Sequence, residues 1–335
     1  MTPLFHPTLV NGPTGDPALY IELLFERRAL MFDLGEIPRL TPRKILRLSH
    51  VFVSHTHMDH FAGFDRLVRL CLGRDVDLQL FGPPGFINQV MHKLQGYSWN
   101  LVRNYTNDFR ITAREYHPDG SLHSGQFQCR RAFTHEPGET VATQQGILLD
   151  EAFFRIRAVH LDHKIPCLAF CLEEKQHVNV WKNRLDELGL PTGPWLKELK
   201  TAVLDGVADD TTFVIRWREA GEWRERSYPL GELKNTLLNI VPGQKIAYVV
   251  DAGYTEQNIR AIVNLAANAD ALFIEAVFLQ QDLQRAEQTH HLTAQQAGEL
   301  GRSAHARRLI PFHFSPRYSG SEAMLREEAK HTFRS

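Results

Sequence analysis

The stretch Ser54-His55-Thr56-His57-Met58-Asp59-His60 decides how the rest of the chain is interpreted. It places three imidazoles and one carboxylate within the six positions from His55 to His60. The apolar residues 50–53 before it predict a buried strand, and residues 61–72 after it have apolar side chains at helical spacing. Because α/β folds place their chemistry between a strand and the following helix, we expect a functional site at this loop.

The residue types in this loop predict a metal site. Neutral imidazole nitrogens and carboxylate oxygens are the ligands of zinc in hydrolytic sites, where one coordination position stays open for water. A single histidine at a strand end usually caps the next helix or faces solvent. The spacing His-x-His-x-Asp-His is much harder to explain in that way, and one loop of this kind can serve two metal ions.

Composition narrows the class of protein. The 335 residues are 43% hydrophobic and 23% charged, which is typical of a globular protein. A formal net charge of −1 argues against a generally basic nucleic-acid-binding protein and leaves room for a local basic patch. We expect no membrane span and no secretory signal, hence a cytoplasmic protein. The cysteines are sparse and form no C-x-x-C pair, which predicts neither disulfides nor a thiolate zinc site; they are Cys71, Cys129, Cys167 and Cys171.

The histidine loop resembles the histidine motif of the metallo-β-lactamase superfamily. The resemblance implies an α/β fold, the αββα sandwich of two mixed sheets flanked by helices. It also implies that His55 and His57 hold one metal, and that Asp59 and His60 hold the other. Two complete sites would need three more ligands, a His, an Asp and a His, each at the end of a later strand.

The chain offers candidates for all three. His163 is preferred to His160 because the family pattern places this ligand just before the apolar segment that enters the next strand. Asp251 follows a buried strand and is the expected bridging carboxylate, and capping of the helix that follows is its alternative role. His313 follows the last predicted strand and would be the final ligand.

Several segments are similar to ribonuclease Z, a family of endonucleases that process the 3′ end of transfer RNA. His313-Phe314-Ser315-Pro316-Arg317-Tyr318 resembles the closing motif of the family. Residues 81–85 and 193–200 resemble two further family segments. Residues 273–276 and 290–294 resemble the paired Glu and His near the scissile phosphate. The similarity therefore spans most of the chain.

The resemblance implies a mechanism. Asp59, a metal ligand and proton acceptor, would orient the nucleophilic hydroxide. His291, held by Glu275, would stabilise the phosphate oxygens or protonate the leaving 3′ oxygen, and a buried strand-end cap is the alternative for Glu275. Two zinc ions would activate water and offset charge in the transition state. Manganese and iron accept the same ligands.

Substrate recognition is where the chain departs from the family pattern. The resemblance assigns substrate contacts to Ser315, Arg317 and Lys197, and a solvated surface charge is the alternative for Lys197. The region at about 174–243 lacks the long glycine- and proline-rich arm with which many family members hold the transfer-RNA elbow. Residues 214–226 interleave aromatic side chains with arginines, which suits base stacking and a plain hairpin equally well.

We therefore expect one metallo-β-lactamase-fold domain over residues 1–335, with an inserted, substrate-facing region at about 174–243. Its expected activity is ribonuclease Z-like 3′ processing of precursor transfer RNA, and hydrolysis of small phosphodiesters is expected as well. The expected protein is a homodimer with two zinc ions per subunit. One alternative is a phosphodiesterase for small or cyclic nucleotides. Others are a nucleic-acid-binding relative with an altered site and, more remotely, a hydrolase of thioesters or β-lactams.

Overall fold

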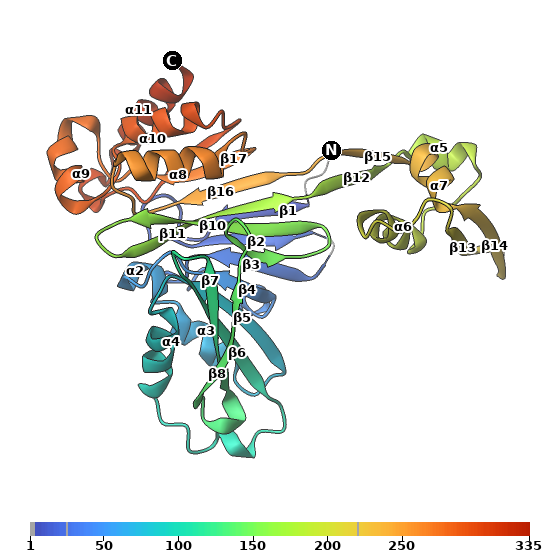
Figure 1. The fold of residues 1–335 in the computed structure, drawn as a ribbon, viewed down its shortest axis with the longest axis horizontal. Helices are drawn as coiled ribbons and strands as arrows, with labels where there is room; N and C mark the ends of the chain where they lie inside the picture. Colours follow the sequence, from blue (N-terminus) through green and yellow to red (C-terminus); the bar gives the residue numbers. More distant parts are fainter. Residues whose placement is uncertain (1–3, 25, 220) are drawn as a thin grey trace. The chain divides into compact units, whose positions relative to one another are not determined.

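The computed structural model describes residues 4–24, 26–219 and 221–335 (Figure 1). Phe25, the last residue of the apolar run 19–25 that predicts a strand in the sequence, lies outside these ranges. By their contacts the residues form two units. The larger unit runs up to Leu149 and continues through Ile156–Leu172 and Lys245–Ser335, whereas the smaller comprises Asp150–Arg155 and Glu173–Gln244.

An eight-stranded sheet forms the first half of the larger unit, and its strands follow one another in chain order. The strands are β1 (Phe5–Leu9), β2 (Leu19–Leu23), β3 (Arg28–Phe32), β4 (Leu48–Phe52), β5 (Val76–Gly82), β6 (Phe109–Tyr116), β7 (Ser121–Gln128) and β8 (His135–Ala142). Strands β3 to β6 are parallel, and the flanking pairs are antiparallel. Its helices are α1 (Pro42–Ile45), α2 (Met58–Phe61), α3 (Phe64–Cys71) and α4 (Phe86–Gln95).

A six-stranded sheet in the order β18-β17-β16-β11-β10-β9 forms the second half. Its strands are β9 (Ile147–Asp150), β10 (Phe154–Asp162), β11 (Pro166–Glu174), β16 (Lys245–Val249), β17 (Ala271–Glu275) and β18 (Leu309–Phe312). Figure 1 shows α8 (Glu256–Ala266), α10 (Ala294–Ser303) and α11 (Glu322–Arg334) on the side of β16 to β18. The short α9 (Leu283–Thr289) precedes α10.

Aromatic side chains join the inner faces of the two sheets. Phe32 of β3 stacks on Phe170 of β11 with 5.4 Å between ring centroids, and Phe52 of β4 lies 5.8 Å from the same ring. Tyr248 of β16 lies 5.6 Å from the Phe32 ring. All four rings are fully buried, so they form one apolar layer between the sheets. The predicted α/β sandwich of two mixed sheets with flanking helices is confirmed.

The apolar run 127–134 has the sequence pattern of one strand, and the structure corrects this interpretation. Strand β7 ends at Gln128, a short 3-10 helix spans Cys129–Arg131, and Ala132 and Phe133 have φ values of 54° and 52°. Phe133 is 2% exposed and lies against Trp99 with 4.7 Å between ring centroids. The apolar residues of this run therefore lie in a buried turn. A buried turn and a buried strand can both appear as a short apolar run in the sequence.

The smaller unit has a hydrophobic core of its own. Strands β12 (Gln176–Val180) and β15 (Leu238–Pro242) pair, and β13 (Thr212–Glu219) and β14 (Glu222–Pro229) form a hairpin. Its helices are α5 (Lys182–Glu187), α6 (Trp195–Leu204) and α7 (Leu230–Leu237). Trp195, Leu199 and Ile215 are buried in this core. The unit contains the segment predicted as an insertion, and its substrate-facing role stays a prediction.

In the part of the chain that the structure describes, no helix combines the length and the apolar character needed to cross a membrane.

Candidate metal centre

The histidine loop is held in place by close backbone contacts at two glycines. A Cβ atom at Gly63 would lie 2.2 Å from the carbonyl oxygen of Gly35, and a Cβ at Gly35 would lie 2.4 Å from that of Asp59. Only glycine permits such an approach, so α2 closes directly against the turn after β3. The Ser54 carbonyl accepts from the backbone N–H of Leu168, which ties the loop to β11 of the second sheet.

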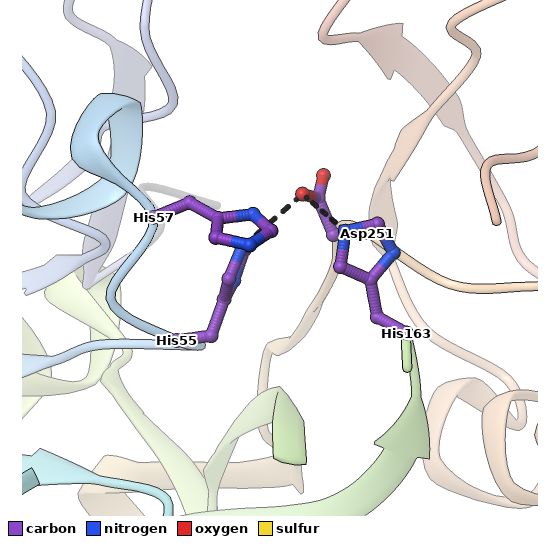
Figure 2. A group of neighbouring side chains, drawn as sticks. All are labelled: His55, His57, His163 and Asp251. Atoms are coloured by element: carbon purple, nitrogen blue, oxygen red, sulfur yellow. Dashed lines mark ion pairs between the residues drawn. The ribbon is translucent and has the colours of Figure 1, made fainter. Parts of the chain in front are cut away.

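Asp251 lies at the centre of the cluster. Its side chain is almost fully buried, and Oδ2 lies 3.3 Å from Nε2 of His55 and 3.3 Å from Nε2 of His163. Figure 2 shows the carboxylate pointing between these two imidazoles, with His57 beside His55. The same Oδ2 lies 3.5 Å from Nε2 of His60, and Oδ1 lies 3.0 Å from Nδ1 of His313. One carboxylate thus faces histidines on two sides.

Potential ligand atoms gather in three groups, in each of which they lie within 4.8 Å of one another. The groups are His55, His57, His163 and Asp251; Asp251, Glu275, His291 and His313; and Asp59, His60 and His313. They include all seven side chains predicted as ligands, together with the predicted Glu–His pair. His160 instead stacks on the Tyr116 ring, with 4.8 Å between centroids. The structure brings the candidates together, and which of them bind metal stays a prediction.

The donor set fits a divalent metal. Among the described residues, Nε2 of His55, Nε2 of His60, Nδ1 of His313 and Oδ1 of Asp251 are buried without a hydrogen-bond partner. Each unsatisfied buried group costs about 1–3 kcal/mol. These atoms are divided among the three donor groups, so cations bound in those groups would satisfy them. A mixed imidazole and carboxylate set suits zinc, manganese or iron.

The opposite ring nitrogens orient two of these histidines. Nδ1 of His60 lies 2.9 Å from Oδ2 of Asp33, and Nδ1 of His163 lies 2.8 Å from the carbonyl oxygen of His290. Both partners only accept hydrogen bonds, so each Nδ1 carries the proton and donates. Each Nε2 is thereby turned toward Asp251, and a hydrogen bond at the opposite ring nitrogen is the arrangement that orients histidine for a metal.

Asp33 is a site residue that the sequence analysis missed. It is fully buried after β3, and it accepts hydrogen bonds from the backbone N–H of Ser54 (2.6 Å) and the Ser54 hydroxyl (2.9 Å). The Tyr248 hydroxyl donates to its Oδ2 at 2.9 Å from the other sheet. The sequence did contain a signal for this role, because Asp33 directly follows an apolar strand and precedes Gly35 by two residues. An acid in such surroundings needs partners, because an isolated buried charge is very costly.

Charge dominates the ionisation of the cluster. Burial alone would raise the pKa of Asp59, but the neighbouring imidazoles of His313 and His60 outweigh it and hold the pKa well below its usual range. Burial would lower the pKa of His60, yet the charges of Asp251 and Asp33 raise it well above its usual value. The carboxylates of the cluster therefore stay ionised and favour positive charge beside them.

The predicted pair of Glu275 and His291 is in contact. Glu275 ends β17, and its Oε1 accepts from the backbone N–H groups of Ala252 (2.9 Å) and Leu292 (3.0 Å). Its Oε2 accepts from Nδ1 of His291 at 2.8 Å. Burial opposes the charge on Glu275, but His291 outweighs it and lowers the pKa to about 2. Burial likewise opposes the charge on His291, and Glu275 raises its pKa.

The predicted substrate contacts have local roles in the structure. The Ser315 hydroxyl caps the turn Pro316–Tyr318 by accepting from the backbone N–H of Arg317. The Arg317 guanidinium donates to Asp282 at 3.0 Å and lies over the Phe278 ring. Lys197 is exposed on α6 of the smaller unit. Contacts of these three residues with a substrate stay predictions.

Solved structures of low sequence identity share the fold. The metallo-β-lactamase fold protein YhfI from Bacillus subtilis is 16% identical with a TM-score of 0.55, and the match covers 98% of this chain and 95% of YhfI. The short form of human tRNase Z is 17% identical with a TM-score of 0.52, covering 94% and 93%. These neighbours show that the chain has the metallo-β-lactamase fold, and the histidine and carboxylate cluster lies within that fold.

Sequence relatives narrow the class to one family. No family model matches the chain. A ribonuclease Z from Deinococcus radiodurans is 33% identical over 317 residues, which cover 92% of this chain and 90% of the relative. A ribonuclease Z from Bacteroides thetaiotaomicron is 27% identical over 312 residues, covering 90% and 81%. The chain belongs to the ribonuclease Z family, whose members are endoribonucleases of this class.

Proposed function

We propose that this family member uses two zinc ions to cleave precursor transfer RNA directly after the 3′ end of the mature transfer-RNA sequence. The observation that best supports two ions is the orientation of Asp251. One of its oxygens lies 3.3 Å from two imidazoles and the other lies 3.0 Å from a third, so a single carboxylate can serve both ions. The name tRNase Z of the human structural neighbour supports the choice of substrate.

The proposed ligand assignment follows the three groups of donor atoms. His55, His57 and His163 would hold one ion, Asp59, His60 and His313 would hold the other, and Asp251 would bridge them. Ions bound there supply an activated water and positive charge to offset the developing charge at phosphorus.

The remaining steps fall to side chains of the chain itself. Asp59, whose low pKa keeps it ionised, accepts a hydrogen bond from the attacking water and orients it. As the new bond from water to phosphorus forms, the bond to the ribose 3′ oxygen breaks. His291, held by Glu275 and with a raised pKa, donates its Nε2 proton to that leaving oxygen. Arg317 would bind a neighbouring phosphate.

A phosphodiesterase for small or cyclic nucleotides is the second candidate. The formal net charge of −1 favours it, because strong binding of RNA depends on clustered cations. The two candidates share the metal centre and differ in the surface around it.

The deciding experiment compares two substrates with one enzyme preparation. Zinc-loaded protein is incubated with a 3′-extended precursor transfer RNA and, separately, with a small chromogenic phosphodiester. We expect cleavage of the RNA at one position, directly after the discriminator nucleotide. Turnover of the small ester with no cleavage of the RNA would contradict the proposal and favour the second candidate.

The predicted homodimer and cytoplasmic location remain proposals as well. Light scattering of the purified chain would test the dimer, for which twice the mass of the 335-residue chain is expected. Fractionation of cells that make the chain would test the location.

A further inference from the structure

A basic groove lies between β18 and α11. It is a depression of about 420 Å³, lined on one side by Arg307, Arg308, Leu309, Ile310 and Pro311, and on the other by Arg326, Lys330, Phe333 and Arg334. Of the described residues that line it, five carry a positive charge and none carries a negative charge. The chain as a whole has 38 basic and 39 acidic residues, so this concentration of cations is a local feature.

Three of the cations form a row along α11. Arg326, Lys330 and Arg334 are spaced four residues apart, which places them on one face of a helix. A rise of about 1.5 Å per residue puts the first and the last about 12 Å apart along the helix axis. All three are exposed, and Lys330 meets Glu327 only at 3.9 Å between exposed side chains, a pairing that is worth little.

The cations beside β18 are more constrained. Arg307 forms an ion pair with Asp270 at 2.8 Å, and Nε of Arg308 donates to the Asp270 carbonyl oxygen. Both guanidinium groups are therefore oriented by the end of the neighbouring loop. The row on α11 supplies most of the charge that remains available to a ligand.

The groove leads to the metal centre. Among the described strands, β18 is at the edge of its sheet, and His313 follows it directly. At about 3.3 Å per residue, the five residues from Arg308 to His313 span about 17 Å. The Arg326 guanidinium lies over the Phe314 ring, 5.8 Å from its centroid, so the helical row begins beside the residue after His313. The groove therefore runs along the strand that ends at the candidate metal centre.

We propose that the β18–α11 groove binds the sugar-phosphate backbone of the RNA as it extends away from the cleavage site. This inference rests on the proposed function and adds an RNA-binding surface outside the cleavage site. A groove lined by five cations and by no carboxylate attracts a polyanion. Its apolar residues Leu309, Pro311 and Phe333 accommodate ribose and the aliphatic stems of the cations. An acidic peptide is also a polyanion, but the position of the groove beside the strand that ends at the proposed phosphodiester-cleaving centre favours RNA.

The test removes the row on α11 and measures how binding depends on salt. The variant is Arg326→Gln/Lys330→Gln/Arg334→Gln in the zinc-loaded full chain. The control, Arg43→Gln/Arg66→Gln/Arg69→Gln, removes three exposed arginines from α1 and α3 of the same unit. Binding of a 3′-extended precursor transfer RNA is measured between 50 and 200 mM salt, because each lost phosphate contact lowers the slope of log K against log salt by about 0.9.

The expected result separates binding from chemistry. In the groove variant, the magnitude of the slope of log K against log salt should fall by about 2 to 3, and the KM for the RNA should rise. The kcat for the RNA and the turnover of the small phosphodiester should stay unchanged. The control should resemble the wild type. An unchanged slope in the groove variant, or an equal loss in the control, would overturn the proposal.

Two further outcomes distinguish the possible failures. If a polyglutamate peptide binds as tightly as the RNA and loses its binding in the same variant, the groove belongs to an acidic protein partner and the proposal is wrong. If the wild type does not cleave the RNA, the proposed function fails. Cleavage by the wild type with unchanged binding by the groove variant refutes the groove alone.

Discussion

Three side chains of the metal centre sit on backbone that L-residues adopt reluctantly. Asp33, Asp251 and His313 have φ values of 56°, 50° and 57°, and each follows the last residues of a strand. Left-handed backbone of this kind costs about 1–2 kcal/mol per residue, less for aspartate, whose side chain can hydrogen-bond locally. Such strain collects at functional sites, where the surrounding structure holds the residue. The strand ends thus aim these side chains at one point.

Asp33→Asn tests the support behind His60. Asparagine tolerates the left-handed backbone but cannot present two accepting oxygens to Ser54, His60 and Tyr248. Loss of such an outer partner typically weakens metal binding 10- to 100-fold, and we expect a weakening of about that size. Competition with a chromophoric chelator measures it. Metal affinity equal to that of the wild type would contradict the role given to Asp33.

We expect the histidines of the centre to be of two kinds, those that bind metal and one that takes part in proton transfer. His57→Ala should abolish bound metal and turnover together, whereas His291→Ala should keep nearly all metal and lower kcat by about 10²–10⁴-fold. His160→Ala is the matched control, because His160 stacks on Tyr116 away from the donor groups, and it should change neither quantity. Metal content by atomic emission and single-turnover rates report the two effects. Equal metal loss in the His57 and His291 variants would remove the catalytic role of His291.

At the scale of elements, the strands with strong apolar patterns could be predicted and others could not. The short apolar runs 78–81 and 271–274 have the sequence pattern of strands, and they lie within β5 and β17. β8 was missed because most of its side chains are exposed and it contains a proline and a glycine, so no alternating pattern marks it. Its strand conformation comes from pairing with β7, a tertiary contact that local sequence does not encode.

Gly298→Ala tests the packing of α10 on α11. The added carbon would lie 2.5 Å from the carbonyl oxygen of Ala329 and 2.9 Å from Cβ of Thr332, so the helices must separate. Overpacking costs about 1–3 kcal/mol, and the better helix propensity of alanine offsets about 1 kcal/mol of this. We expect a net loss of up to about 2 kcal/mol in the free energy of unfolding, measured by urea denaturation.

Gly96→Ala is the control for this substitution. Gly96 has an ordinary φ of −65°, and its added carbon would meet no described atom nearer than 3.3 Å. This variant should be as stable as the wild type or slightly more stable. A Gly298→Ala protein that is as stable as the Gly96→Ala protein would show that the two helices pack less tightly than described.

At the scale of the whole molecule, the centre depends on both sheets. The four candidate ligands of the histidine loop come from one motif, whereas the choice of His163, Asp251 and His313 required the resemblance as well as strand-end positions. Tyr248 was not predicted, because its partner Asp33 lies 215 residues away and only the packing of the sheets joins them. Contacts of this kind have no local signature in a sequence.

Removal of metal should therefore weaken the entire larger unit. A metal that binds only the folded state adds about 4 kcal/mol to the free energy of unfolding when its free concentration is 1,000 times its Kd. We expect the urea midpoint of the chelated protein to lie clearly below that of the zinc-loaded protein, and re-addition of zinc to restore it. His57→Ala should show a much smaller difference. Identical midpoints with and without zinc would argue against a centre that joins the sheets.

The order in which the ligands occur along the chain also bears on protein synthesis. His60 emerges from the ribosome early, but His313 follows about 250 residues later, a delay of roughly 10–50 s at 5–20 residues per second. During that interval the nascent chain holds an incomplete set of donors and lacks the strand that completes the cleavage site. A truncated or unfinished copy would thus be inert toward the RNAs around it, so that a nuclease made beside abundant RNA becomes active only once its last strand is in place.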